Sequence, residues 1–214
     1  MKKKAFRLVA FTLAEVLITL GIIGVVAALT IPTLMQKYRT HLVETKLKEG
    51  HSTLANNWKM NQVEYGLNFV PEGFPAKDPD AALEKFEKYF VPNIKFIEVK
   101  KGTKGVYGLM PNGSSLYFYR RSGSDDGWGN VYIFICIEEK DCEALDAASE
   151  PYTYANVGKT SFVTTVQGIV PLNWYSDKSI DGLNNSCAGT AKGACTAVIF
   201  QNGWKIPDGY PFKF

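Results

Sequence analysis

A single acidic residue, Glu15, stands near the start of a long apolar run. No other charged side chain occurs between Val16 and Leu34. A short basic stretch precedes the run, with Lys2, Lys3, Lys4 and Arg7. A carboxylate in a lipid-embedded helix costs about 2.5–3.5 kcal/mol at the bilayer centre and less near its edge. Since a simple membrane anchor gains nothing from that cost, the position of Glu15 predicts a partner that carries the opposite charge.

The apolar run allows three interpretations. A cleaved signal peptide has a basic start, an apolar stretch of about 7–15 residues and a small-residue cleavage site. Ala27-Ala28 would be a weak site of this kind, but residues 16–34 form too long a run. A plain signal anchor fits the length, and the basic stretch would hold the N-terminus in the cytoplasm, yet the anchor leaves Glu15 unexplained. The third interpretation rests on a family resemblance.

Residues 10–18, which read Ala-Phe-Thr-Leu-Ala-Glu-Val-Leu-Ile, resemble the processing site of type IV prepilins and of the pseudopilins of type II secretion systems. In that family a prepilin peptidase cuts ahead of an aromatic residue on the cytoplasmic side. The new N-terminus is then methylated, and an acid occupies the fifth mature position. The resemblance implies a cut between Ala10 and Phe11, which makes Glu15 the fifth residue. Ala10 departs from the pattern, because a glycine usually precedes the cut.

Further residues of the run agree with the family pattern. Gly21, Gly24 and Pro32 stand where family members carry two glycines and a helix-bending proline, so the resemblance assigns them to assembly. After the cut, the α-amine of Phe11 would be cationic near neutral pH. Glu15 of a neighbouring subunit could pair with it, which offsets two desolvation costs and fixes the register between subunits. Alternatively, the Glu15 side chain reaches the lipid headgroups from its own helix.

Composition and charge exclude several other classes of protein. The chain has 214 residues and a net charge of +3. The basic stretch alone supplies four positive charges, more than this net charge. The rest of the chain is therefore not basic, and we expect no nucleic-acid partner. Aromatic residues make up 13% of the chain, which suits a β-containing globular domain better than a disordered one. Because no hydrolase, phosphate-loop or zinc-protease motif occurs, we expect neither an enzyme nor a cofactor.

The apolar pattern predicts an α+β fold. Residues 11–65 read as one long helix that Pro32 should kink. Beyond the membrane segment its apolar face follows steps of three and four at Leu47, His51, Leu54, Trp58, Gln62 and Tyr65. A second helix is expected from Asp78-Pro79 to about Pro92, with its buried side at Leu83, Phe86 and Phe90. The period then changes to two, which predicts antiparallel strands at 106–110, 115–119, 131–137 and 161–172, and a last hairpin over 196–206.

These elements divide the chain into three expected parts. Residues 1–10 form a basic leader, and residues 11–35 form the transmembrane and assembly helix. Residues 36–214 form a periplasmic or extracellular pilin-like domain, in which 36–66 extend the helix and 67–214 hold the second helix and the sheet. In the family that the N-terminus resembles, the sheet likewise packs against the C-terminal half of the long helix.

Four cysteines indicate two disulfides of an exported protein. Three pairings are possible, and we favour those that are close in sequence, Cys187 with Cys195 and Cys136 with Cys142. The family resembled often has a disulfide-bounded loop near its C-terminus, which supports the first pair. Cys136 lies inside the apolar strand pattern and is alternatively a buried thiol.

One acidic turn is a weak calcium candidate. Asp125 and Asp126 offer the oxygen ligands that calcium prefers, and some pseudopilins bind calcium through loop acids. The spacing of an EF-hand is absent, and no distant acid is assignable as a further ligand. A solvated turn is the simpler interpretation, so we expect no metal.

The sequence thus predicts a structural subunit of a type IV pilus or of a type II secretion pseudopilus. It would cross the inner membrane once with its N-terminus in the cytoplasm, and then enter a periplasmic or extracellular filament. Its partners would be a prepilin peptidase, other pilin or pseudopilin subunits, an assembly platform in the inner membrane and the lipid bilayer. The alternative is a membrane-anchored or secreted binding module of the adhesin kind, with a contact surface supplied by Trp128, Trp174 and Trp204.

Overall fold

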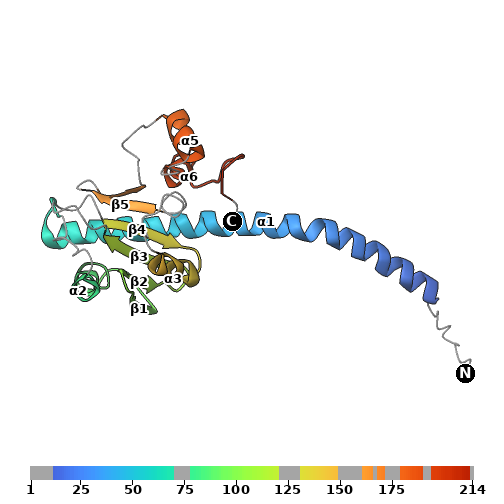
Figure 1. The fold of residues 1–214 in the computed structure, drawn as a ribbon, viewed down its shortest axis with the longest axis horizontal. Coiled ribbons are helices and arrows are strands. Elements are labelled where there is room, and N and C mark those ends of the chain that lie inside the picture. The colour runs from blue at the N-terminus through green and yellow to red at the C-terminus, as the bar shows by residue number, and fades with distance from the viewer. Residues whose placement is uncertain are drawn as a thin grey trace, which may run out of the picture. The chain divides into compact units, whose positions relative to one another are not determined.

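The structure is a computed structural model (Figure 1) that divides into two compact units, Met1–His41 and Leu42–Phe214. It describes residues 12–69, 78–120, 131–148, 161–165, 168–171, 179–189 and 194–212. The smaller unit consists, in its described part, of the first half of one helix. The larger unit holds the second half of that helix, the strands and the other helices. The α+β prediction is confirmed.

The long helix α1 spans Leu13–Tyr65 and is followed by Gly66. Gly66 has a φ of 100°, a left-handed conformation that glycine adopts without strain. The helix therefore ends where the sequence predicts. Pro32 lies inside α1, which continues on both sides of it although the proline contributes no N–H to the helix.

The second half of α1 buries one face inside the larger unit. Of the six packing positions predicted there, three are buried, two are half-buried and only Tyr65 is exposed. Five further positions are buried as well: Val43, Glu44, Gly50, Asn57 and Asn61. A Cβ atom placed on Gly50 would lie 2.8 Å from Ile135 Cδ1. The missing side chain thus lets the helix approach the sheet closely.

The strands form one antiparallel sheet in the order β1-β2-β3-β4-β5-β6 (Figure 1). Their bounds are Glu98–Lys101, Gly105–Leu109, Ser115–Arg120, Val131–Cys136, Ser161–Thr165 and Gly168–Pro171. Strand β4, which corresponds to the strand predicted at 131–137, is buried along its whole length and lies between β3 and β5. Its partner β3 follows a turn in which Gly113 has a φ of 75°. The register places Leu116 opposite Ile135.

The prediction of one strand over residues 161–172 is wrong. The segment is divided into β5 and β6, which pair with each other so that Thr165 lies opposite Gly168. Gly168 has a φ of 133°, which only glycine adopts readily. A single glycine in an otherwise β-forming sequence thus reverses the chain.

The prediction of a hairpin over residues 196–206 is also wrong, because Cys195–Gln201 is the helix α6. All of residues 195–199 are buried, and a short segment that is buried on every side has no apolar period that separates strand from helix. Asn202-Gly203, which would form the turn of the predicted hairpin, instead ends the helix. Gly203 has a φ of 64°, and the N–H of Trp204 donates to the carbonyl of Ile199 at 2.9 Å.

Helix α2 confirms the second predicted helix and spans Pro79–Tyr89. Its N-cap is Asp78, whose Oδ1 accepts the N–H of Ala81 at 3.0 Å. Besides α6, two further helices of the described segments were not predicted. They are α3, at Glu139–Ala147, and α5, at Ile180–Ala188, and each contains one of the cysteines.

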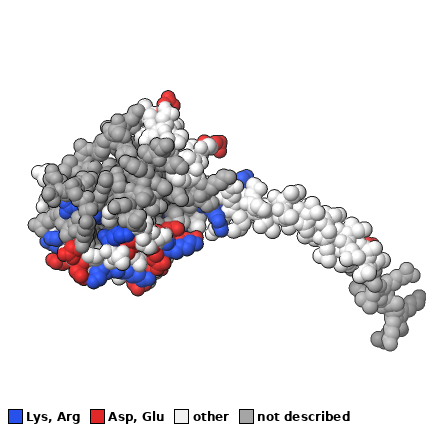
Figure 2. All heavy atoms as spheres, in the orientation of Figure 1, with Lys and Arg blue, Asp and Glu red and all other residues white. Residues whose placement is uncertain are grey.

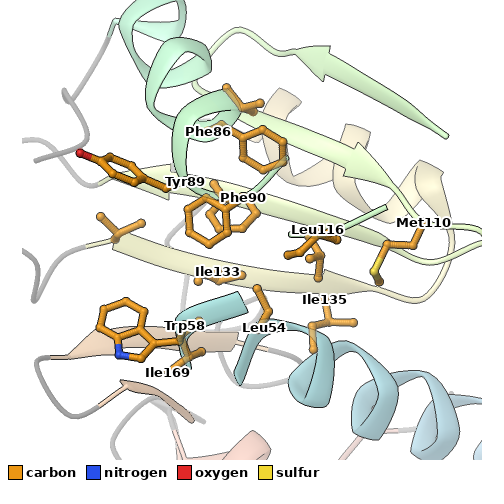
Figure 3. Close-up of a cluster of buried hydrophobic side chains, with 14 of the residues drawn as sticks. Leu54, Trp58, Phe86, Tyr89, Phe90, Met110, Leu116, Ile133, Ile135 and Ile169 are labelled. Atoms are coloured by element: carbon orange, nitrogen blue, oxygen red, sulfur yellow. The ribbon is translucent and has the colours of Figure 1, made fainter. Parts of the chain in front are cut away.

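The main core lies between α1, α2 and one face of the sheet (Figure 3). Phe86 of α2 and Phe90, which directly follows this helix, are buried as predicted, and their ring centroids lie 4.8 and 4.3 Å from that of Phe118 in β3. Leu83 is only half-buried, since the helix instead turns Ala82 and Tyr89 inward. The other sheet face holds a second cluster with α3, formed by Tyr117, Tyr119, Tyr132, Phe134, Cys136, Cys142 and Leu145. Side chains of β3 and β4 thus alternate between two buried faces.

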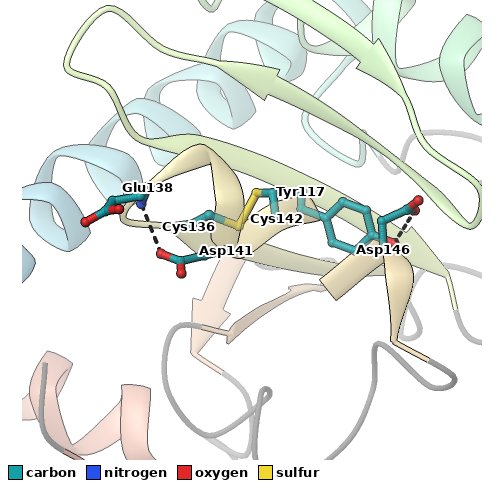
Figure 4. Close-up of a disulfide and its surroundings, with 6 residues drawn as sticks. All are labelled: Tyr117, Cys136, Glu138, Asp141, Cys142 and Asp146. Atoms are coloured by element: carbon teal, nitrogen blue, oxygen red, sulfur yellow. Dashed lines mark hydrogen bonds between the residues drawn. A yellow bond between two sulfur atoms is a disulfide. The ribbon is translucent and has the colours of Figure 1, made fainter. Parts of the chain in front are cut away.

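Both favoured disulfides are present. Cys136–Cys142 joins the end of β4 to α3 (Figure 4), and Cys187–Cys195 joins α5 to α6. All four sulfur-bearing side chains are buried. Because Cys136 is bonded to Cys142, it is not the buried free thiol of the alternative interpretation.

Removing the second disulfide is expected to lower the free energy of unfolding. The bridge closes a loop with a sequence separation of 8, for which the chain-entropy model gives about 2–3 kcal/mol. Changing both Cys187 and Cys195 to alanine should lower the denaturation midpoint accordingly, measured by urea unfolding of the full chain in detergent. The wild-type protein under reducing conditions, in which the bridge is opened, is the control. An unchanged midpoint in both the variant and the reduced wild type would contradict the prediction.

A buried carboxylate, Asp146, ties the β1–β2 turn to the C-terminal end of α3. Its oxygens accept hydrogen bonds from Thr103 N (2.6 Å), Thr103 Oγ1 (2.8 Å), Lys104 N (3.0 Å), Gly105 N (3.2 Å) and the Tyr117 hydroxyl (3.1 Å; Figure 4). Burial alone would raise the pKa of Asp146, but the hydrogen bonds from Thr103 and Lys104 outweigh it and lower this pKa. The ionised form is thus the one that the fold stabilises.

Asp146→Asn is expected to reduce the free energy of unfolding by at least about 2 kcal/mol, because an amide nitrogen would face donors that now have an acceptor. The advantage of the wild type is present above the unfolded pKa of about 3.9 and is lost as the pH falls through the lower folded value. Urea unfolding from pH 7 to pH 3 measures both effects. Glu143→Gln, an exposed change on the same helix, should alter stability by less than about 0.5 kcal/mol.

Candidate functional site

The described part of the smaller unit, residues 12–41, has no buried side chain. Large apolar side chains point outward around the whole helix; Leu17, Ile18 and Ile23 are each more than 60% exposed. Figure 2 shows this stretch as an almost uncharged surface. Its mean hydropathy reaches 2.3 over 18 residues, so this helix could span a membrane. A helix that is apolar all round requires lipid or other helices around it.

Glu15 lies in the first turn of α1, and its carboxylate binds the start of its own helix. Oε2 accepts hydrogen bonds from Thr12 N (2.9 Å) and Thr12 Oγ1 (2.7 Å), while Thr12 Oγ1 accepts the N–H of Glu15 (3.3 Å). This reciprocal arrangement is a capping box, which satisfies N–H groups that a helix start leaves unpaired. Its signal, a threonine three residues ahead of a glutamate, is present in the sequence, although the capping box was not predicted.

The capping box occupies one oxygen of the Glu15 carboxylate. The second oxygen, Oε1, has no hydrogen bond with any residue of the described segments. An ionised carboxylate can accept about four hydrogen bonds. The geometry therefore leaves room for a cation beside Glu15 without breaking the capping box.

The hydroxyl groups within the apolar segment are satisfied by the helix itself. Thr19 Oγ1 donates to the carbonyl of Glu15 at 2.7 Å, and Thr30 Oγ1 donates to that of Val26 at 2.9 Å. Lipid offers no hydrogen-bond partners, so polar groups inside a bilayer must be paired within the protein. Glu15 is then the one ionised side chain of this stretch with unused acceptor capacity.

Within the described segments, no residue packs against Gly21 or Gly24. A Cβ atom placed on either glycine would meet no atom within 4 Å. The two lie three residues apart, on one side of the helix, where small residues let a second helix approach closely. Pro32 leaves the carbonyl of Ala28 without its usual helical donor.

Several predicted residues lie outside the described residues: Ala10, Phe11, Asp125, Asp126, Trp128 and Trp174. The described residues hold no group of three or more side chains suited to binding a metal ion. Trp204 is half-buried, and its ring packs against those of His51 and Phe200 with centroids 4.9 and 5.1 Å apart. It therefore contributes to the core rather than to the exposed aromatic surface expected of a binding module.

Two ionisable residues of α1 have structural roles in the larger unit, and only His51 was among the predicted packing positions. Glu44 is buried, and its two oxygens accept hydrogen bonds from Lys205 Nζ (2.8 Å) and Ile206 N (2.9 Å). His51 lies against Ile169, and burial lowers its pKa, although the backbone hydrogen bond opposes this shift. Both attach the helix to segments far along the chain.

A groove of about 450 Å³ runs beside the same part of α1. Its lining includes five uncharged hydrogen-bonding side chains, Ser52, Thr53, Asn56, Asn93 and Asn112. Its acid, Glu49, accepts a hydrogen bond from Asn112 Nδ2 at 2.9 Å. No cysteine or histidine is among the lining residues, so the groove offers no thiolate nucleophile and no imidazole base.

Comparison with known proteins gives one match. A model described as a family of unknown function (DUF6613) matches residues 33–214, which is most of the chain. The match begins after the segment that carries Glu15, Gly21 and Gly24. Among the curated proteins and the solved structures, none matches.

Proposed function

This chain belongs to the family of unknown function DUF6613, and we propose that it is a subunit of a type IV pilus or of a type II secretion pseudopilus. The observation that carries the proposal is the environment of Glu15. This acid lies at the start of a helix segment that is apolar all round, and one of its carboxylate oxygens has no partner among the described residues. Its neighbourhood includes the Ala10-Phe11 junction that resembles a prepilin cleavage site.

Cleavage at that junction would create the missing cation. A new α-amine at Phe11 stands four residues before Glu15 and is positively charged near neutral pH. An amine on a neighbouring subunit can approach Oε1 while the capping box with Thr12 stays intact. In an apolar surrounding, leaving either charge unpaired costs about 3–5 kcal/mol, so the pair favours subunits in one fixed stagger.

The apolar surface supports the same proposal. Inside a bilayer, lipid covers the side chains of residues 13–35. In a filament outside the bilayer they need another apolar environment, and other copies of the same helix supply it along the whole segment. Gly21 and Gly24 would permit the close approach of two such helices.

The proposed location is the bacterial inner membrane, with the N-terminus in the cytoplasm and the larger unit in an oxidising compartment. The basic leader supports this orientation, and two disulfides suit such a compartment. The partners would be a prepilin peptidase, an assembly platform and other pilin or pseudopilin subunits. The chain would be a substrate of the peptidase and not itself an enzyme.

Mass spectrometry of the mature N-terminus tests the proposal directly. We expect the protein isolated from its native membrane or filament to begin at a methylated Phe11. In cells that lack prepilin peptidase the same protein should begin at Met1. A mature protein that starts after Ala28 would instead establish an ordinary secretory signal, and a Met1 start in assembled filaments would contradict processing.

A further inference from the structure

The last turn of the smaller unit carries basic and aromatic side chains at one level of the helix. Lys37, Tyr38 and Arg39 are all exposed, Tyr38 by 61%. No acidic residue occurs between Val16 and Val43. The next acid, Glu44, is buried and already binds Lys205 and the backbone of Ile206. The chain thus places two positive charges here without a local counter-charge.

Both cations lack partners in the part of the chain that the structure describes. Neither Lys37 nor Arg39 makes a hydrogen bond or an ion pair with any residue that the structure describes. A helix rises about 1.5 Å per residue, so Lys37 lies about 33 Å along α1 from Glu15. This length matches the hydrocarbon core of a bilayer, about 30 Å thick. If Glu15 marks one edge of the core, Lys37 and Arg39 lie at the opposite edge.

The arrangement around the helix indicates the kind of partner. Successive residues of an α-helix are about 100° apart, so Lys37, Tyr38 and Arg39 point to three different sides. A protein bound to one face of the helix would meet one or two of them. A layer of lipid headgroups surrounds the helix and meets all three.

We propose that Lys37 and Arg39 bind the phosphate groups of anionic phospholipids at the membrane surface opposite Glu15. The guanidinium of Arg39 can bind phosphate oxygens in a bidentate manner, while Lys37 acts as a compact charge. Tyr38 suits the boundary between the hydrocarbon core and the lipid headgroups, since its ring is apolar and its hydroxyl is polar. The inference rests on the membrane insertion contained in the proposed function, but not on filament assembly.

The test measures lipids that stay bound to the unassembled full-length chain. The protein is reconstituted in nanodiscs of equimolar phosphatidylcholine and phosphatidylglycerol, and native mass spectrometry gives the ratio of the two lipids retained. We expect phosphatidylglycerol to be enriched. The double variant K37Q/R39Q should lose this enrichment by about fivefold for each cation removed, which corresponds to about 1 kcal/mol per basic residue near an anionic surface.

Two further variants serve as controls. K48Q/K59Q removes two exposed lysines from the same helix, farther along it, and should keep the wild-type enrichment. K37R/R39K preserves both charges and should keep it too. Equal enrichment in K37Q/R39Q and the wild type would overturn the inference, as would an equal loss in K48Q/K59Q.

The outcome is separable from that of the proposed function. If the wild-type chain does not insert in nanodiscs, both proposals fail. If it inserts and enriches phosphatidylglycerol but never forms filaments, the lipid site stands and the filament proposal fails. If filaments form but no lipid preference is measured, the filament proposal stands and the lipid site fails.

Discussion

Subunits with Glu15→Ala are expected to insert in the membrane at least as well as the wild type, but to assemble about a hundredfold less or not at all. Insertion becomes easier because a charge no longer has to enter an apolar environment. Assembly fails because the α-amine of a neighbouring Phe11 loses its counter-charge, at a cost of about 3–5 kcal/mol. Membrane fractionation measures the first quantity, and the yield of sheared or purified filaments measures the second.

The capping box supplies controls that separate charge from helix capping. Glu15→Gln removes the charge, yet glutamine still serves as the second residue of a capping box. Thr12→Val breaks the capping box and leaves the charge. If pairing drives assembly, Glu15→Gln fails like Glu15→Ala while Thr12→Val assembles. The opposite pattern would assign Glu15 to capping alone, and normal filaments from all three variants would remove it from the assembly site.

Ala10→Lys is expected to stop processing. A long charged side chain at the proposed cut should not fit where the family usually has glycine, so the protein would keep its Met1 start and remain in the membrane without assembling. Without cleavage no α-amine forms at Phe11, and Glu15 has no cation to bind. A size shift on denaturing gels and N-terminal mass spectrometry report the result.

Ala10→Gly is the matched variant, because it restores the residue that usually precedes the cut. It should be processed at least as fast as the wild type in a pulse-chase experiment. Processing of Ala10→Lys at the wild-type rate would show that the peptidase does not read this position, and a cut elsewhere would then have to be sought.

The elements that could be predicted from the sequence are those with a clear period or a clear boundary. Helix α1 has apolar positions at steps of three and four over a long stretch, and a glycine follows its last residue. Helix α2 begins with an aspartate-proline cap, and β4 is a long run of β-branched and aromatic residues. Residues 195–199 of α6 form a short segment that is buried on every side, so the choice between strand and helix depended on packing against the rest of the unit. That packing is not visible in a local pattern.

The candidate site shows a similar limit. Glu15 was identifiable because a charge in an apolar run is conspicuous. Its hydrogen bonds with Thr12 could have been predicted from the spacing of three residues between them. The roles of Glu44 and Asp146 were not, since their partners lie 161 or 162 residues away for Glu44 and 29 to 43 residues away for Asp146. Only the folded chain brings those groups together.

The attachment of α1 inside the larger unit has a mechanical consequence. Near the start of that unit Glu44 binds Lys205 and Ile206, and two residues later Lys46 Nζ donates to the carbonyl of Ile137 at 2.7 Å. A pull along the axis of α1 would therefore act on the C-terminal segment and on the end of β4 at the same time. Because these bonds would be strained together rather than one after another, tension along α1 in the proposed filament would be shared between two distant parts of the chain.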